Sequence, residues 1–266
     1  MGARRRTPED RPVTLGVLTS RPIDRREDGR AILGALREHL GIHPTLYGNW
    51  EPLNRRFDSS APDSALYSWK FPGLLWSNHE RRVDGHVGIG RRAYITLRTV
   101  PGAFRQDQLE SLLVAWSRIA DADFAWLHRL TDAEVSRGLA NRTVNLVDRI
   151  ARTYLLFVTV HELRRFVPDL YWATVFGPPY VEMFGRERFE SLSGAERIQA
   201  DQFLVRLTPR LDDLVDAPAE IEGRRRYVRS QLGENAFFDP AFGPDHRYAA
   251  PVFEEHAESP ESAHWD

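Results

Sequence analysis

One stretch of the sequence, residues 171–190 (YWATVFGPPYVEMFGRERFE), restricts the fold more than any other. A glycine and two prolines at 177–179 fix a turn, and Gly185 follows a second Phe-Gly step. The aromatic side chains around them need burial. We predict a strand over 171–176 and a helix over 178–189. The stretch shows no catalytic nucleophile, metal-ligand set or phosphate loop, so we expect its role to be structural.

The composition is that of an ordinary globular protein. Of the 266 residues, 42% are hydrophobic and 28% are charged, which is enough chain for a substantial core. Cysteine is absent, which excludes a disulfide framework and a thiolate metal site. The N-terminal arginines are not followed by the apolar run of a secretory signal. No stretch approaches the roughly 20 apolar residues of a membrane helix. We therefore expect no membrane contact.

The charge pattern divides the chain into three parts. A net charge of -2, from 36 basic and 38 acidic residues, gives no general reason to bind nucleic acid. Residues 239–266 are rich in acids and prolines, so we expect a flexible acidic tail that is dispensable for folding. The basic and proline-containing residues 1–12 predict a flexible N-terminus. A single domain is expected over 13–238.

Short strands and amphipathic helices follow one another along this domain. Strands are expected over 13–19, 83–90, 93–100, 124–130 and 203–208, and helices over 28–40, 107–120 and 218–232. The hairpin 83–100, the helix 107–120 and the strand 124–130 together give a β-β-α-β unit. We predict an α+β fold in which a mixed or mainly antiparallel sheet is packed by amphipathic helices.

The segment 144–160 gives two conflicting signals. Val144, Val147 and Ile150 are three residues apart, which favours a helix. Residues 154–160 are rich in aromatic and β-branched side chains, which favours a strand, and we adopt a strand for this second part.

The sequence contains no recognisable catalytic or metal-binding motif. His161 and Glu162 begin like a zinc-peptidase helix, but the second histidine would be needed where Arg165 stands. Glu162 is better explained as the capping-box partner of Thr159. His128 falls in the middle of a predicted strand, and we expect a structural histidine at a sheet edge. We predict no catalytic residue, no metal and no cofactor.

Several segments resemble one bacterial family. The run PDLYWATVFGPPYVEMFGRERFESL, residues 168–192, looks like the signature of the bacterial immunity protein 52 family. The segments YGNWEPLNRRFD (47–58) and FAWLHRLTDAEV (124–135), together with Trp69 and residues 74–76, are also similar to that family. The resemblance extends over roughly residues 14–233.

The resemblance implies a function without turnover. Such immunity proteins are cytoplasmic and protect a bacterium by binding a cognate toxin, often one delivered by a contact-dependent or type VI secretion system. The implied partner is a toxin protein domain, and the toxins of this family include nucleases. A nuclease needs a basic cleft, so an inhibitor gains association rate by presenting acids to it. The candidate binding residues are the anchors Tyr47 and Trp50 with the neighbouring Glu51, and the acids Asp212, Asp213 and Asp216.

Two other classes of function stay open at this point. One is an enzyme whose site is assembled from distant residues such as His86, His128 and Glu182. The other is a structural module that self-associates through an edge strand. The sequence names neither the toxin nor the oligomeric state.

Overall fold

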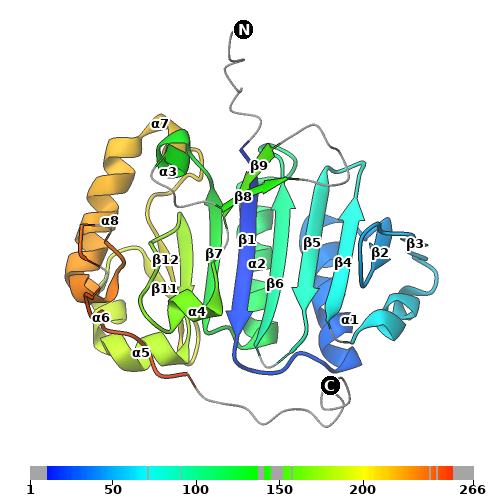
Figure 1. The fold of residues 1–266 in the computed structure, drawn as a ribbon, viewed down its shortest axis with the longest axis horizontal. Coiled ribbons are helices and arrows are strands. Elements are labelled where there is room, and N and C mark those ends of the chain that lie inside the picture. The colour runs from blue at the N-terminus through cyan, green and yellow to red at the C-terminus, as the bar shows by residue number, and fades with distance from the viewer. Residues whose placement is uncertain are drawn as a thin grey trace, which may run out of the picture.

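The computed structural model describes residues 11–253 apart from residues 71, 91, 137–140, 145–151, 157, 240 and 244. A 10-stranded sheet runs through the molecule, and each neighbouring pair of strands is antiparallel (Figure 1). The order across it is β11-β12-β10-β7-β1-β6-β5-β4-β2-β3. Its strands are β1 (Val13–Thr19), β2 (Leu46–Gly48), β3 (Arg55–Arg56), β4 (Gly73–Asn78), β5 (Val83–Gly88), β6 (Ala93–Thr99), β7 (Phe124–Arg129), β10 (Ala173–Phe176), β11 (Ala195–Gln199) and β12 (Gln202–Arg206). A separate hairpin pairs β8 (Asn141–Val144) with β9 (Arg152–Leu155). The expected α+β class with a mainly antiparallel sheet is confirmed.

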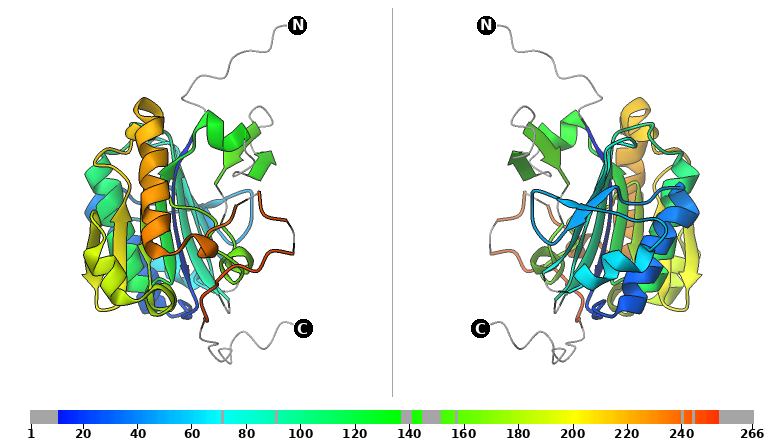
Figure 2. Two further views of the ribbon diagram at one scale, coloured as in Figure 1. Left: turned by 90° about the vertical axis from the view of Figure 1, so that its left-hand side faces the viewer. Right: turned by 90° about the vertical axis from the view of Figure 1, so that its right-hand side faces the viewer.

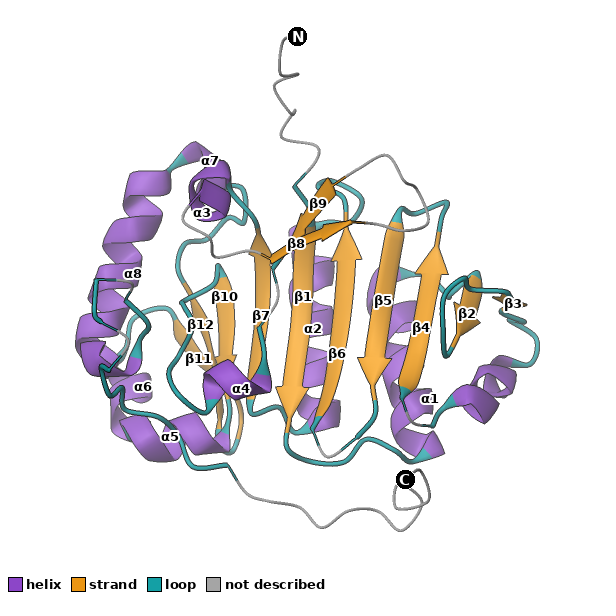
Figure 3. Ribbon diagram, in the orientation of Figure 1, coloured by secondary structure: helices purple, strands orange, loops and turns teal. Residues whose placement is uncertain are grey.

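Helices pack against both faces of this sheet, but unevenly. They are α1 (Arg26–Ala35), the π-helical turn η2 (Leu36–Leu40), the 3-10 helix η3 (Pro62–Ser68), α2 (Gln106–Ala120), α3 (Asp132–Ser136), α4 (Val160–Leu163), α5 (Pro178–Phe184), α6 (Arg186–Ser191), α7 (Asp213–Asp216), α8 (Pro218–Leu232) and the 3-10 helix η4 (Glu234–Ala236). Helices α1 and α2 lie side by side on one face of the sheet, as the views in Figures 2 and 3 show. The indole of Trp116 on α2 ties them together by donating to the carbonyl of Ile32 at 3.0 Å.

The half of the sheet that contains β1, β7, β10 and β12 is buried on both faces. Nearly every residue of these strands is buried, with no alternation. On one face α2 packs against β1 and β7. On the other face Phe176 lies 5.6 Å from Tyr180 of α5, and Phe189 of α6 lies 5.1 Å from Phe203, measured between ring centroids. The stretch 171–190 therefore forms the aromatic core of this half, which agrees with the structural role expected for it.

Position 177 needs glycine because there is no room for a side chain, not because of its backbone angles. Its φ of -92° and ψ of -170° are ordinary extended values. A Cβ atom added there would lie 1.9 Å from the carbonyl oxygen of Ala122. Eight residues later, Gly185 has a φ of 88° and ends α5. The single helix expected over 178–189 is consequently two helices, α5 and α6, because the left-handed residue reverses the backbone direction between them.

The other half of the sheet, from β6 to β3, is covered on one face only. Burial alternates along β6 and through most of β5, as expected for strands with one solvated face. The covered face packs on α1 and η3, and there Trp76 of β4 lies over Gly85 of β5, where an added Cβ atom would meet its ring at 2.4 Å. The opposite face carries half-exposed polar side chains.

The sequence pattern located most of these elements. The hairpin of β5 and β6, the helix α2, the strand β7 and the helix α8 were expected and are confirmed. The polar edge strand β11 was not expected. Val144 belongs to a strand rather than to a helix. Of the strand expected over 154–160, only Tyr154 and Leu155 lie in a strand, β9, and Val160 begins α4, so most of that prediction is wrong. Residues 145–151, which carry the rest of the helical signal, lie outside the described residues.

The C-terminal segment packs against the domain as far as the structure describes it. Tyr248 lies 5.3 Å from the ring of Phe166, and its hydroxyl donates to the carbonyl of Asp239 at 3.1 Å. Pro251 is buried, and Phe253 lies 6.1 Å from Tyr180. Composition alone suggests none of these contacts. The acidic residues 254–266 lie outside the described residues.

Candidate functional site

Two aromatic side chains are prominently exposed at the end of the sheet closed by β3. Trp50, in the loop after β2, is 72% exposed, and Tyr67, on η3, is 71% exposed. η3 packs beside α1 at this edge, onto which the right-hand view of Figure 2 looks. The basic side chains Arg26, Arg55 and Lys70 are exposed around them. We name the surface formed by Arg26, Trp50, Arg55, Tyr67 and Lys70 the Trp50 corner.

Ser68 joins the segments that carry the Trp50 corner. The side-chain amide of Asn49 donates to the carbonyl of Ser68 at 2.8 Å and to that of Gly73 at 2.6 Å. The backbone N–H of Lys70 donates to the same Ser68 carbonyl at 3.0 Å, and the guanidinium of Arg55 donates to the Ser68 hydroxyl. Trp50 and Tyr67 are each the chain neighbour of a residue in this hydrogen-bonded knot, so their backbone positions are fixed relative to one another.

Buried aromatic residues support the corner from below. Trp69 is buried, and its indole donates to the carbonyl of Ile23 at 2.8 Å. Tyr47 is only 7% exposed and lies edge-on to Phe57 at 6.5 Å. Tyr47 was expected as a surface anchor, but its burial places it in the core beneath the corner. Trp50 and Glu51 are on the surface.

The exposed side chains of the Trp50 corner include three cations. The guanidinium of Arg26 lies 4.9 Å from the ring centroid of Tyr67, which is a cation–π distance. Within the described part of the chain, no ion pair joins Arg26, Arg55 or Lys70 to a carboxylate. The nearby Asp63 is held by Arg30 at 2.7 Å.

The candidate acids Asp212, Asp213 and Asp216 lie at α7, away from the Trp50 corner, and each has an arginine beside it. Asp212 accepts from Arg129 at 2.8 Å, and Asp216 accepts from Arg210 at 2.6 Å. Asp213 also lies beside Arg210, at 3.5 Å. Figure 1 shows α7 and β3 at opposite ends of the molecule. Arg129 is on β7, six strand spacings from β3, or roughly 30 Å. The structure therefore does not bring the two groups of candidate residues together.

The solvated face of β5 and β6 presents a second polar cluster. The hydroxyl of Tyr94 lies 2.9 Å from Nδ1 of His86 directly beside an Asp84–Arg98 pair, whose shortest contact is 2.8 Å. Burial lowers the pKa of His86 and raises the pKa of Tyr94. Both groups are therefore neutral near pH 7 and can exchange hydrogen bonds with a ligand.

A buried ionic network occupies the two-sided half. Arg225 of α8 and Glu134 of α3, whose side chains are each 4% exposed, pair at 2.6 Å. Arg225 also donates to the carbonyl of Leu170 at 3.0 Å, and Arg229 pairs with Asp169 at 2.6 Å. The network fastens α8 to the segment before β10.

His128 completes this network. The backbone N–H of Trp172 donates to Nδ1 of His128 at 3.1 Å, so the ring proton is on Nε2, which donates to Glu134 at 3.0 Å. Burial would raise the pKa of Glu134, but His128 and Arg225 outweigh it and hold that pKa far below its ordinary value. His128 is structural, as expected, but β7 is an interior strand, so its predicted place at a sheet edge is wrong.

The residues of the alternative enzyme site are dispersed. His86 on β5 and His128 on β7 are separated by β6 and β1, or roughly 14 Å. Glu182 is exposed on α5. In the described part of the chain no three histidine or carboxylate side chains gather as a metal site, and no helix there is long and apolar enough to cross a membrane.

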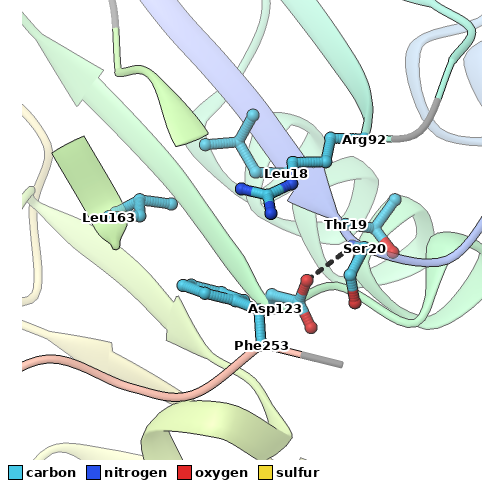
Figure 4. A pocket seen from close by; sticks show the side chains of 7 residues that line it. All are labelled: Leu18, Thr19, Ser20, Arg92, Asp123, Leu163 and Phe253. Atoms are coloured by element: carbon cyan, nitrogen blue, oxygen red, sulfur yellow. Dashed lines mark hydrogen bonds between the residues drawn. The ribbon is translucent and has the colours of Figure 1, made fainter. Parts of the chain in front are cut away.

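A small cavity lies where β1 ends. It measures about 10 Å³, which is close to the room that one water molecule needs. Leu18, Leu163 and Phe253 supply its apolar wall, and Figure 4 shows Arg92 and Asp123 at the same space. The carboxylate of Asp123 accepts from the backbone N–H of Ser20 at 2.5 Å. The cavity is too small for an organic ligand.

Sequence reasoning found only part of the Trp50 corner. Tyr67 and Arg26 were not expected there, because they come from segments distant from Trp50. No local pattern marked Tyr67, because the burial of its neighbours Leu66 and Ser68 is known only from the fold.

Comparison with known proteins yields a similarity of fold. No protein-family model matches the chain, so the immunity protein 52 family is not confirmed, and no curated protein matches it. Among solved structures, the chain is similar to the Pseudomonas aeruginosa T6SS protein PA0821, with a TM-score of 0.56 and 9% sequence identity. The alignment covers 90% of this chain and 78% of that one. The chain thus shares its fold with a type VI secretion protein.

Proposed function

We propose that this protein is an immunity protein that neutralises a cognate bacterial toxin by stoichiometric binding. The observation that carries the proposal is the fold shared with a type VI secretion protein over 90% of this chain. The resemblance of residues 168–192 to an immunity family points to the same biological setting. In this proposal the toxin is a substrate of such a secretion system and is bound in the cytoplasm.

The fold is suited to inhibition by binding. A large sheet with buried aromatic packing and buried ion pairs provides a stable scaffold, and a scaffold that stays ordered loses little entropy when a partner docks. The exposed surface includes aromatic and arginine side chains, which supply most of the energy in protein interfaces. A tight one-to-one complex needs no bound cofactor and no reaction.

Co-expression tests the proposal. The toxin domain encoded next to this gene is expressed in a sensitive host with and without the chain. We expect survival only with the chain present, and a complex of the two purified proteins that elutes together on sizing. Equal killing in both cases, with no complex between the purified domains, contradicts the proposal.

A variant provides the control for folding. Gly177→Val should abolish protection, because its side chain would collide with the backbone of residue 122. Protection that persists with this variant unfolded would mean that survival does not come from the folded chain.

A further inference from the structure

We infer that the Trp50 corner is the surface that contacts the toxin, and that the toxin presents carboxylates to it. This inference rests on the proposed function and adds the location of the interface and the chemistry of the partner. It replaces the expectation of an acidic inhibitor surface on α7.

The Trp50 corner is distinguished by the exposure of its aromatic side chains. Trp50 and Tyr67, at 72% and 71%, are the most exposed aromatic side chains of the described residues. The other exposed aromatic side chains there, Tyr227 at 40% and Phe242 at 47%, lie on α8 and in the C-terminal segment. Trp50 and Tyr67 instead sit beside one hydrogen-bonded knot at Ser68. Aromatic side chains are frequent anchors of protein interfaces.

Hydrogen bonds hold the loop that carries Trp50 in place. The Asn49 amide binds carbonyls on two separate segments, at Ser68 and Gly73, and Arg55 binds the hydroxyl of Ser68. The loop that carries Trp50 is therefore braced against η3 and the start of β4. A loop held by hydrogen bonds loses little conformational entropy on docking. Most of the free energy gained by burying its aromatic side chains therefore contributes to the affinity.

The charges of the Trp50 corner indicate which groups the partner presents to it. Arg26 lies over the ring of Tyr67, and Lys70 is exposed three residues further along the chain; neither forms an ion pair with a carboxylate of the described residues. Asp63, the neighbouring acid, is held by Arg30 at 2.7 Å, and its charge also attracts Arg26. On α7, by contrast, each candidate acid has an arginine beside it. Glu51, next to Trp50, is also exposed, but the three cations Arg26, Arg55 and Lys70 outnumber it, and carboxylates on the partner would pair with the excess positive charge.

The position in the sheet is consistent with contact through side chains. β3 ends the sheet and consists of Arg55 and Arg56 only. A short, charged edge strand does not template a further strand. The partner is therefore recognised by the aromatic and basic side chains rather than by extension of the sheet.

Binding of the purified toxin domain encoded next to this gene tests the inference. Trp50→Ala and Tyr67→Ala should each raise Kd about 30-fold, as the loss of a hot-spot side chain does. Lys70→Glu should slow association, and the wild-type association rate should fall as salt rises. Tyr227→Ala, an exposed aromatic on α8, is the matched control and should bind like the wild type. Melting temperatures of all variants should equal that of the wild type, because these side chains are exposed.

The outcomes separate the two proposals. If the wild type binds and both alanine variants bind equally well, the Trp50 corner is overturned while the proposed function stands. If Lys70→Glu associates faster, the assignment of carboxylates to the partner is overturned. If the wild type does not bind the toxin domain, the proposed function fails and this inference fails with it.

Discussion

The two halves of the sheet solve the problem of burial differently. From β12 to β1, aromatic side chains fill one face and α2 fills the other, so each strand is buried on both sides. From β6 to β3, α1 and η3 cover one face, and the opposite face keeps polar, half-exposed side chains. The first half is a rigid core, and the second half leaves surface free for contacts.

The two halves also treat charge differently. The pair Arg225–Glu134 has both side chains at 4% exposure, whereas in the pair Arg98–Asp84 the side chains are 24% and 47% exposed. A buried pair becomes costly when one member is lost, because the other charge is left without water. A half-exposed pair loses little, because water replaces the partner. Ion pairs with similar geometry therefore contribute differently to the free energy of unfolding in the two halves.

The largest effect is expected where backbone meets backbone in the two-sided half. Gly177→Ala places a Cβ atom 1.9 Å from the carbonyl oxygen of Ala122, which cannot move without displacing β7. We expect a loss of about 3 kcal/mol or more in the free energy of unfolding, measured by urea denaturation. The control is Gly223→Ala in α8, where an added Cβ meets nothing within 4 Å. It should stabilise by about 1 kcal/mol. Equal stability of the two variants would show that the backbone around Gly177 can shift enough to accommodate a Cβ atom.

A matched pair of substitutions compares the two halves directly. Arg225→Met leaves Glu134 and Asp169 buried without their shared cation, and should cost about 3–5 kcal/mol. Arg98→Met should cost about 1 kcal/mol or less. Chemical denaturation of both variants at pH 7 measures the difference. Similar costs would mean that the two halves are equally solvated.

The sequence predicted the elements of the two halves better than their roles. Alternation along β6 and the helical period of α2 are local patterns, so these elements could be found from neighbouring residues alone. The two-sided burial of β10 could also be read from its continuous apolar run. The polar edge strand β11 has no such pattern, because Ile198 is the one buried residue among its five.

The candidate site was less predictable, since it depends on residues that are distant in the chain. Trp50 was identified because the polar residue Glu51 stands between it and Pro52 in a loop. Tyr67 is brought to the corner by the hydrogen bond from Asn49 to the carbonyl of its neighbour Ser68, which no local pattern encodes. Likewise, Asp212 looks like a free acid until the fold places Arg129 of β7 next to it.

A smaller effect is expected at the C-terminal segment, which packs near the two-sided half. A truncation after Asp239 removes Tyr248, Pro251 and Phe253, which contact Phe166 and Tyr180. We expect a loss of about 2 kcal/mol, because Pro251 is buried but Tyr248 and Phe253 are only partly covered. Thermal melting checks this. A truncation after Phe253 keeps the described contacts and serves as the control. If both truncations melt like the full chain, the segment is dispensable, as its composition predicts.

The smallest effect concerns protonation in the one-sided half. Burial lowers the pKa of His86, so the unfolded chain binds a proton at this histidine more readily than the folded chain does. The contribution of His86 to stability is therefore fully present above the unfolded pKa of about 6.5 and decreases as pH falls below it. An NMR titration of the ring, assigned with His86→Gln, should give a pKa below the ordinary histidine value. Tyr94→Phe should leave that pKa low, because burial rather than the hydroxyl lowers it. Since the Trp50 corner lies at the sheet edge, the titration should also be unchanged when the toxin domain is bound. A further fall of the pKa on binding would instead place the partner over β5 and β6, where it would exclude water from His86.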